Sequence, residues 1–319
     1  MPEPRPRYVG FHLTERCDSR CLHCDLWRLP AHEEVPAELL CKTVHELREW
    51  LGPIEIQIAG GEPLLSKNLV ELVRCAKSHD LVTTMTSNGF ALTGDKARDL
   101  AAAGLDSLAL SLDGFTEQHN ALRQRPDAFA LAERAISHAA DNGIAVRINC
   151  VICELNIDIL PGFVTWVSEH PRLTGVFFQA MMQPFGQPRR ERWWLDEKLF
   201  PQDPDRAVAV LKQLLSMKIS GFPVLNPDEQ LVAMASYFLD PERAATARCS
   251  VGDFGITIEG TGAIKLCGAF PPIGDLRDRH HLRDVYLGPR AKEVRAQMAA
   301  CRDNCHLALN CCFDEGVTL

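Results

Sequence analysis

The sequence predicts an α/β protein, a partial (β/α)6 TIM-like barrel followed by a small C-terminal domain. Short apolar runs and amphipathic helical patterns alternate six times before residue 219, and such alternation builds a parallel sheet with right-handed crossovers. Six units rather than eight indicate a barrel that closes only in part. Beyond residue 240 the alternation gives way to spaced cysteines around a glycine-containing hairpin. We therefore expect two domains, residues 1–240 and 241–319.

The expected elements follow in order along the chain. Strands, rich in aliphatic and β-branched residues, are predicted at Tyr8–Leu13, Glu55–Ala59, Val82–Ser87, Ser107–Leu112, Ala145–Ile152 and Val176–Gln183. Helices, with apolar residues at helical spacing, are predicted at Ala37–Leu51, Asn68–His79, Gly94–Ala103, Asp127–Asn142, Ile157–His170, Asp205–Lys218 and Asp228–Leu239. Functional residues of such a barrel lie at the carboxyl ends of its strands.

Composition limits the classes of function. The 319 residues carry a net charge of −8, which argues against a nucleic-acid partner and is compatible with a cationic substrate. The N-terminus lacks the apolar core of a signal peptide, and no apolar stretch reaches the ~18 residues of a membrane span. Thirteen cysteines in spaced groups favour metal or cluster binding in a reducing compartment. We expect a cytoplasmic protein that binds neither nucleic acid nor membrane.

The first group of cysteines follows the first predicted strand. Cys17, Cys21 and Cys24 have the spacing C-x3-C-x2-C. Three thiols on one short loop can hold an iron–sulfur cluster and leave its fourth position open, because such clusters are ligated by cysteine thiolates. A zinc site and three unconnected core cysteines are the alternatives, although zinc favours pairs of C-x2-C.

A second motif, Gly60-Gly61-Glu62-Pro63, follows the second predicted strand. Glycines let the backbone approach a ligand closely, and an acid at a strand end can accept hydrogen bonds from an ammonium group. Taken alone, the motif favours a tight turn with a solvated Glu62 over a ligand site.

Together the two motifs resemble those of the radical S-adenosylmethionine (radical SAM) enzymes. The resemblance implies a [4Fe-4S] cluster on Cys17, Cys21 and Cys24, whose open iron binds SAM, with the amino group of SAM held at Gly60, Gly61 and Glu62. It also makes four polar residues on the strands candidate SAM contacts. The alternative interpretation is that these side chains only cap the ends of their strands. These are Ser87, Asn88, Ser111 and Arg147. His23 departs from the family, which often has an aromatic residue before the third cysteine.

Alternation along two strands predicts which side chains point into the barrel. Arg147 and Asn149 share one face of their strand, whereas Cys150 lies on the other and is expected to pack in the core. Cys153, in phase with Asn149, is expected to point toward the active end. By the same parity Ala109, Ser111 and Asp113 face inward. Carboxylates at the barrel mouth for a cationic substrate are expected from Asp113, Glu117 and Glu154.

The C-terminal region carries the second group of cysteines. Cys249 and Cys267 bracket an alternating segment with a glycine turn, which predicts a β-hairpin, and a helix is expected at Arg290–Ala299. Then come Cys301, Cys305 and the adjacent pair Cys311 and Cys312. This arrangement resembles the small auxiliary-cluster domain, called twitch, of some radical SAM enzymes and implies one auxiliary [4Fe-4S] cluster; a zinc ribbon is the competing interpretation.

The resemblance leaves two ligand sets open. In the simplest twitch pattern the ligands are Cys249, Cys267, Cys301 and Cys305. Because the tail has surplus cysteines, Cys267, Cys301, Cys305 and one of Cys311 and Cys312 can instead complete the site. Cys249 is then free to act as a thiol.

The resemblance implies radical chemistry on a substrate carbon, started by a 5′-deoxyadenosyl radical. An external one-electron reductant supplies the electron that cleaves SAM. An epimerase needs a thiol to return hydrogen, for which Cys249 is the first candidate and Cys153 the second. A dehydrogenase needs the auxiliary cluster as electron acceptor. A peptide-modifying maturase and a cluster-bearing sensor are further alternatives. The arrangement resembles aminoglycoside epimerases of the neomycin C to B type, so a small polycationic sugar-like substrate is expected.

Overall fold

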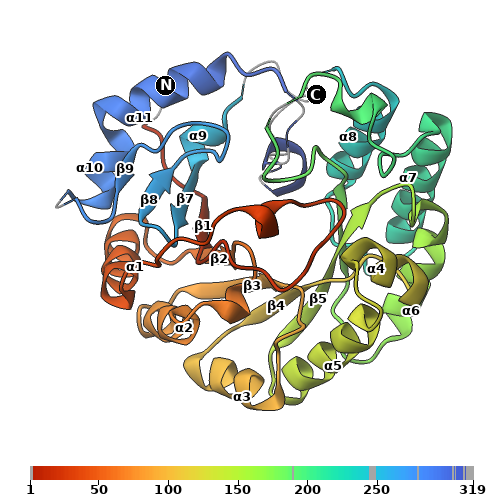
Figure 1. Cartoon of the computed structure of the whole chain (residues 1–319), viewed down its shortest axis with the longest axis horizontal. Helices are drawn as coiled ribbons and strands as arrows, with labels where there is room; N and C mark the ends of the chain where they lie inside the picture. Colours follow the sequence, from red (N-terminus) through yellow and green to blue (C-terminus); the bar gives the residue numbers. More distant parts are fainter. Residues whose placement is uncertain are drawn as a thin grey trace.

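The computed structural model of the chain describes residues 3–188, 190–243, 249–278, 280–303, 305, 307–311 and 313. Its core is a nine-stranded sheet with the order β6-β5-β4-β3-β2-β1-β7-β8-β9. Helices surround this sheet on its outer side (Figure 1). The predicted fold class, an α/β partial barrel, is confirmed.

Six parallel strands form the barrel, each paired with its sequence neighbour. They are β1 (Tyr8–His12), β2 (Glu55–Ala59), β3 (Val82–Ser87), β4 (Ser107–Ser111), β5 (Ala145–Ile152) and β6 (Val176–Ala180). All six lie where the sequence predicts strands, although β6 ends three residues earlier than expected.

The connecting helices also match the prediction, with one addition. They are α1 (Ala37–Leu51), α2 (Leu69–Ser78), α3 (Gly94–Ala103), α4 (Thr116–Arg123), α5 (Ala128–Asp141), α6 (Leu160–Glu169), α7 (Pro204–Ile219) and α8 (Asp228–Leu239). Four short 3-10 turns accompany them: η1 (Leu26–Arg28), η2 (Pro63–Leu65), η3 (Ile157–Ile159) and η4 (Trp193–Leu195). Helix α4 was not predicted, and the expected helix at Ile157–His170 is divided into η3 and α6.

The two faces of the sheet differ in chemistry. On β1, Val9 and Phe11 are fully buried in the core beneath the helices, whereas Tyr8 and His12 alternate with them and are half-buried. Strand β5 alternates in the same way, with Ile148 buried and Arg147 half-buried. Because side chains on a strand alternate between faces, the side away from the helices, which we call the inner face, carries polar groups.

The C-terminal region continues the same sheet. It comprises α9 (Val251–Phe254), β7 (Gly255–Glu259), β8 (Ala263–Lys265), β9 (Gly274–Asp275), α10 (Leu282–Leu287), α11 (Pro289–Ala299) and the π-helical turn η5 (Leu307–Cys311). Strand β7 pairs in parallel with β1, and β8 returns antiparallel to β7 as the predicted hairpin. The division into domains at residue 240 stays a prediction.

Two asparagine side chains bond the outer edge of β6. Asn226 accepts from Phe178 N at 2.7 Å and donates to Phe178 O at 2.9 Å. Asn310, in η5, accepts from Ala180 N at 2.8 Å and donates to Ala180 O at 2.9 Å. The amides thus take the place of a neighbouring strand, and Asn310 fixes η5 beside β6.

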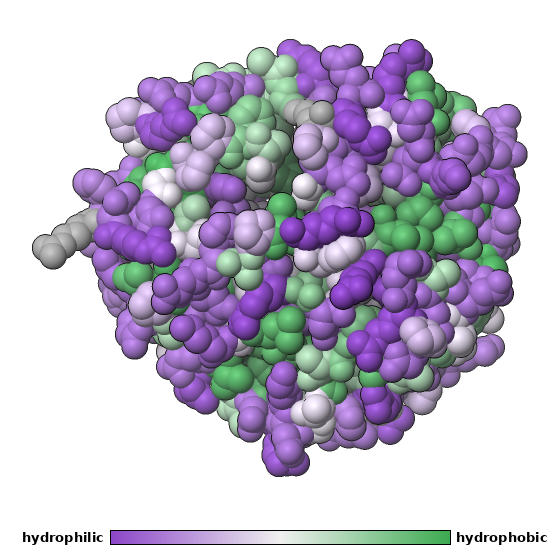
Figure 2. Space-filling view, in the orientation of Figure 1, coloured by the Kyte–Doolittle hydropathy of each residue, from purple (hydrophilic) through white to green (hydrophobic). Residues whose placement is uncertain are grey.

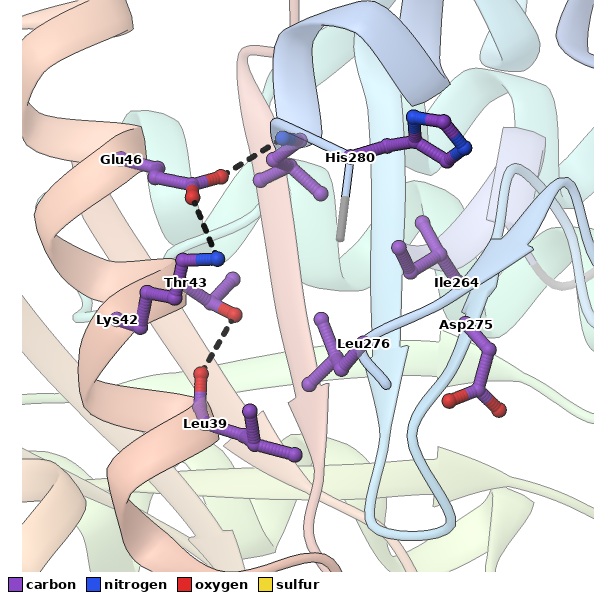
Figure 3. Close-up of a pocket in the computed structure, with 9 residues that line it drawn as sticks. Leu39, Lys42, Thr43, Glu46, Ile264, Asp275, Leu276 and His280 are labelled. Carbon is purple, nitrogen blue, oxygen red and sulfur yellow. Dashed lines mark hydrogen bonds and ion pairs between the residues drawn. The ribbon is translucent and has the colours of Figure 1, made fainter. Parts of the chain in front are cut away.

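The face of the molecule that is turned toward the viewer in Figures 1 and 2 is mostly hydrophilic. It carries smaller apolar patches and a hollow between α9 and α8 (Figure 2). A separate crevice of about 20 Å³ lies on the outside, between α1 and the tail (Figure 3). There Glu46 accepts from Leu282 N at 2.7 Å, so α1 supplies an acceptor for the first turn of α10. The crevice has room for one water molecule and none for a substrate. Within the described residues no helix is long and apolar enough to cross a bilayer.

Candidate active site

The cysteine loop lies between β1 and α1 and crosses the centre of the view in Figure 1. Cys21 is buried, while Cys17 and Cys24 are half-buried. The backbone of the loop bonds the segment that follows β6, because Asp25 N donates to Phe185 O at 2.6 Å. The loop therefore bridges from β1 across the carboxyl edge of the sheet toward β6.

Burial governs the protonation of the two outer thiols. The pKa of Cys17 is raised to about 12 and that of Cys24 to about 11, mainly by burial and in part by the neighbouring Cys21. Thiols must lose their protons to bind iron, so metal binding here releases protons. The loop is protonated at these two residues when no metal is bound.

Arg123, at the end of α4, places a positive charge against Cys21, the middle thiol of the loop. Its Nη1 donates to Cys21 Sγ at 3.4 Å, and Ser19 Oγ lies 3.0 Å from the same sulfur. The other edge of the guanidinium holds Asp113, with Nε at 2.9 Å and Nη2 at 2.7 Å from Oδ2. Arg123 keeps the pKa of the buried Asp113 far below its usual range, against the desolvation that raises it.

The glycine motif packs directly against the start of the cysteine loop. Gly61 N donates to Thr14 O and Glu62 N to Arg16 O, both at 2.7 Å. Gly60 has φ +128°, and a Cβ on it would lie 2.6 Å from Thr14 O. Only glycine fits such a close approach of two backbones at positive φ, so the motif fixes Glu62 relative to the thiols.

Glu62 is 1% exposed and accepts three hydrogen bonds. Its Oε1 accepts from Ser87 Oγ at 2.7 Å and from Leu64 N at 3.0 Å, and its Oε2 accepts from Asn88 N at 2.8 Å. Burial nevertheless raises the pKa of Glu62 to about 7, because these bonds offset only part of the desolvation cost. A positively charged ligand would stabilise its ionised form. The alternative of a solvated turn residue is wrong.

The other candidate SAM contacts are placed in two groups. Ser87 and Asn88 bond Glu62, and Asn88 Nδ2 also donates to Asp18 Oδ1 at 2.8 Å. Ser111 and Arg147 lie on the half-buried inner face. Within the described part of the chain, Arg147 Nε and Asn149 Oδ1 are buried without a hydrogen-bond partner. Unpaired buried polar atoms are uncommon and point to a missing ligand or water.

Three predictions about the carboxyl end of the barrel need correction. Cys153 does not point toward an open active end, because it is fully buried in the core. Asp113 is fully buried and bound to Arg123, so it is not available to a substrate. Glu154 is paired with Arg206 and accepts from Gln202 N. Cys150 is fully buried as predicted, and Glu117 is exposed on α4.

The tail thiols lie near one another. Burial raises the pKa of Cys305 to about 11, and the neighbouring Cys267, Cys249 and Cys301 add to the rise. Burial raises the pKa of Cys311 to about 12, with a contribution from Cys305. Cys312 lies outside the described residues. Among the described side chains no three His, Cys, Asp or Glu residues are grouped to hold a single metal ion.

Sequence reasoning missed several residues of the site. Arg123 and His119 belong to the unpredicted α4, and nothing in a short polar segment indicates that it reaches Cys21. On the inner face beside β1, Glu259 and Lys265 form an ion pair of 2.8 Å. His12 on β1 senses both, since Glu259 raises its pKa and Lys265 lowers it, although burial is the larger effect and lowers it.

Comparison with known proteins identifies the class. The family described as the radical SAM superfamily matches residues 11–165. The GTP 3′,8-cyclase of Peptoclostridium acidaminophilum is 30% identical over 236 residues, which are 70% of this chain and 68% of that protein. The chain belongs to the radical SAM superfamily.

Other relatives match over a smaller share of their length. The pre-heme d1 synthase of Dinoroseobacter shibae is 31% identical over 50% of this chain and 39% of its own length. The Fe-coproporphyrin III synthase of Methanosarcina barkeri is 26% identical over 74% of this chain and 60% of its own length. The chain thus spans between about two and three fifths of these two relatives.

Solved structures share the fold at low sequence identity. Native anSMEcpe with bound AdoMet and Cp18Cys peptide has a TM-score of 0.71 at 16% identity, covering 96% of this chain and 88% of that one. Streptococcus suis SuiB bound to S-adenosylmethionine has a TM-score of 0.68 at 16% identity, covering 92% and 68%. Both support the partial-barrel architecture.

The superfamily implies a [4Fe-4S] cluster and SAM, and the residues present fit both groups. Cys17, Cys21 and Cys24 lie on one loop, with the sulfur of Cys21 paired with a cationic donor. A cluster held by these three thiols has one iron without a protein ligand. Glu62 is a buried carboxylate whose hydrogen-bond donors among the described residues, Ser87 Oγ, Leu64 N and Asn88 N, are uncharged, so an ammonium group would supply a counter-charge.

Proposed function

We propose that the chain is a radical SAM epimerase acting on an amine-bearing sugar of the aminoglycoside class, with Cys249 returning a hydrogen atom to the substrate. The observation that carries the proposal is the surplus of thiols in the tail. Cys249, Cys267 and Cys301 neighbour Cys305, and Cys311 neighbours it in turn. One cluster takes four protein ligands at most, so at least one of these five thiols is left over.

The position of Cys249 suits inversion. Cys17 follows the last residue of β1, whereas Cys249 precedes the first residue of β7, and the two strands are parallel neighbours. Along the chain, the cysteine loop leaves the carboxyl end of β1, whereas Cys249 leads through α9 into the amino end of β7; each strand is about 16 Å long at 3.3 Å per residue. A substrate between the loop and Cys249 can lose hydrogen on one side and receive it on the other.

The roles of the chain follow from this geometry. Bound together, the cluster and SAM supply a 5′-deoxyadenosyl radical that removes hydrogen from a substrate carbon. Cys249 then gives up its S–H hydrogen as a new C–H bond forms on the opposite face. The Cys249 sulfur radical regains an electron from an external one-electron reductant and a proton from solvent. The substrate is inverted without net oxidation.

In this assignment the auxiliary [4Fe-4S] cluster is held by Cys267, Cys301, Cys305 and one of Cys311 and Cys312. Bound there, the cluster would supply one-electron chemistry close to Cys249. The net charge of −8 is consistent with a polycationic substrate, which the acidic surface would attract.

A dehydrogenase is the second candidate, and one observation favours it. Cys249 lies close enough to Cys305 to affect its pKa, as a fourth ligand of the same cluster would. With Cys249 as a ligand, the substrate radical would pass its electron to the auxiliary cluster and release a proton. The product would then be oxidised.

The two candidates are separated with Cys249→Ala, reconstituted anaerobically and assayed in heavy water. If Cys249 is the donor, the variant keeps the iron and sulfide content of the wild type and still forms 5′-deoxyadenosine, but the inverted, deuterated product disappears. Loss of about four irons, with an oxidised product lacking solvent deuterium in the wild type, supports the dehydrogenase. Cys41→Ala, on the outer helix α1, is the matched control.

A further inference from the structure

An ion pair on the inner face joins the last residue of β7 to the last residue of β8. Lys265 Nζ lies 2.8 Å from Glu259 Oε1, and the two side chains are 20% and 24% exposed. They are shielded from bulk solvent without being sealed in the core. An ion pair in such a position is accessible to a small ligand.

The strand register fixes the direction of these side chains. Glu259 pairs with His12 and Thr257 with Gly10, while Ile256 and Ile258 between them are buried on the helix side. Lys265 is opposite Thr257. Because residues paired across strands project to the same face, Glu259 and Lys265 both project to the inner face, beside His12.

The same register places Glu259 level with the glycine motif. His12 pairs with Glu259 on one side and with Ala59 on the other, and Ala59 directly precedes Gly60. Two strand spacings of about 4.8 Å separate the backbones of Glu259 and Ala59 by about 10 Å. A sugar ring bound next to SAM can bridge such a distance.

Two of the three carboxylates that the sequence suggested for substrate binding are paired with arginines, and the third, Glu117, is exposed on α4. Asp113 is held by Arg123, and Glu154 by Arg206. The inner face also carries the buried, unpartnered Arg147 Nε and Asn149 Oδ1 within the described residues. It is therefore a polar surface with hydrogen-bonding capacity left over.

We infer that Glu259 determines specificity for an amine-bearing substrate, by accepting hydrogen bonds from a substrate ammonium group. In the free protein Lys265 forms an ion pair with this carboxylate, and the ammonium group of the ligand displaces Lys265 when it binds. The inference rests on the proposed function in taking an amino sugar as the ligand. A purely structural pair that staples the β7–β8 hairpin would bind no ligand.

Opposite effects of two substitutions distinguish these roles. Glu259→Gln removes the charge that binds the ammonium, so amine affinity should fall at least tenfold. Lys265→Met removes the internal competitor, so amine affinity should stay equal or rise. A purely structural pair predicts instead that both substitutions lower thermal stability alike and leave amine affinity unchanged.

The test is calorimetric titration of the anaerobically reconstituted protein with SAM present, using neomycin C, kanamycin A and spermidine. Glu169→Gln, at the exposed end of α6, is the matched control and should bind like the wild type. Iron content and SAM binding of Glu259→Gln should match the wild type, which shows that the fold is intact.

The possible results of the titration separate the role of Glu259 from the proposed function. Glu259→Gln binding within twofold of the wild type overturns the inference and leaves the proposed function standing. Binding of spermidine but of neither aminoglycoside, abolished by Glu259→Gln, supports the inference and overturns the substrate class. Wild-type protein that binds none of the three amines overturns both.

Discussion

Arg123 donates to the sulfur of Cys21 at 3.4 Å, although the two residues are 102 positions apart in the sequence. The contact sets a fixed cation against a thiol of the cysteine loop. It also depends on Asp113, which holds the other edge of the same guanidinium. A single buried ion pair thus supports both the barrel and the cysteine loop.

Removing Arg123 should destabilise the protein strongly. Arg123→Met leaves Asp113 buried without its counter-charge, which costs about 3–5 kcal/mol of unfolding free energy. Urea denaturation of the apoprotein measures this. Asp113→Asn in the same chain should restore much of the loss, and Arg125→Met, whose partner Asp127 is at the surface, should have little effect. Wild-type stability in Arg123→Met would contradict the assignment.

SAM affinity should depend on pH through Glu62. With a pKa of about 7, the carboxyl is largely protonated below pH 7 and ionised above it. Only the ionised form attracts an ammonium group, so affinity should rise about tenfold per pH unit up to about pH 7 and then level off. Equilibrium dialysis between pH 5.5 and 8.5 measures this. In Glu62→Gln the affinity should be low, and the part of the pH dependence due to Glu62 should vanish.

The same group predicts how stability depends on pH in the apoprotein. The folded pKa of Glu62 is raised from 4.5 to about 7, so the folded state holds a proton that the unfolded state has lost. The contribution of Glu62 to stability therefore falls as pH rises from 4.5 to 7, by about 3 kcal/mol. The difference in unfolding free energy between wild type and Glu62→Gln, measured from pH 5 to 8, should show this slope; a constant difference would rule it out.

The side-chain amides of Asn226 and Asn310 should each stabilise only the part of β6 that they contact. Asn310→Ala leaves the N–H and C=O of Ala180 without their partners, at a cost of about 2–4 kcal/mol. Hydrogen exchange followed by mass spectrometry should speed up around Ala180 and η5, and Asn226→Ala should instead affect Phe178. Equal patterns in the two variants would show that β6 opens as one unit.

The sequence was sufficient for the regular parts of the fold. Apolar periodicity located the six barrel strands and the long helices, because each buries one face against the same core. Helix α4 was missed since it is eight residues long and mostly polar, with only His119, Leu122 and Arg123 buried. Short segments of this kind are held by tertiary contacts that leave no periodic signal.

The site was predictable only in part, for a similar reason. The thiols and Glu62 stand in two compact motifs, and the two motifs taken together indicate their chemistry. The roles of Asp113 and Glu259 depend on which distant residue each one meets. Asp113 is at a strand end like Glu62, but Arg123 folds back onto it. Glu259 gains its position only through the pairing of β7 with β1.

That pairing also has a consequence for how the chain is made. Ile256 pairs with Val9, so β1 leaves the ribosome well before its partner strand, which is synthesised 247 residues later. At 5–20 residues per second the wait is about 12–50 seconds. During that time one edge of β1 stays open, and open edges invite aggregation. The nascent barrel should therefore need a chaperone until residue 259 has emerged.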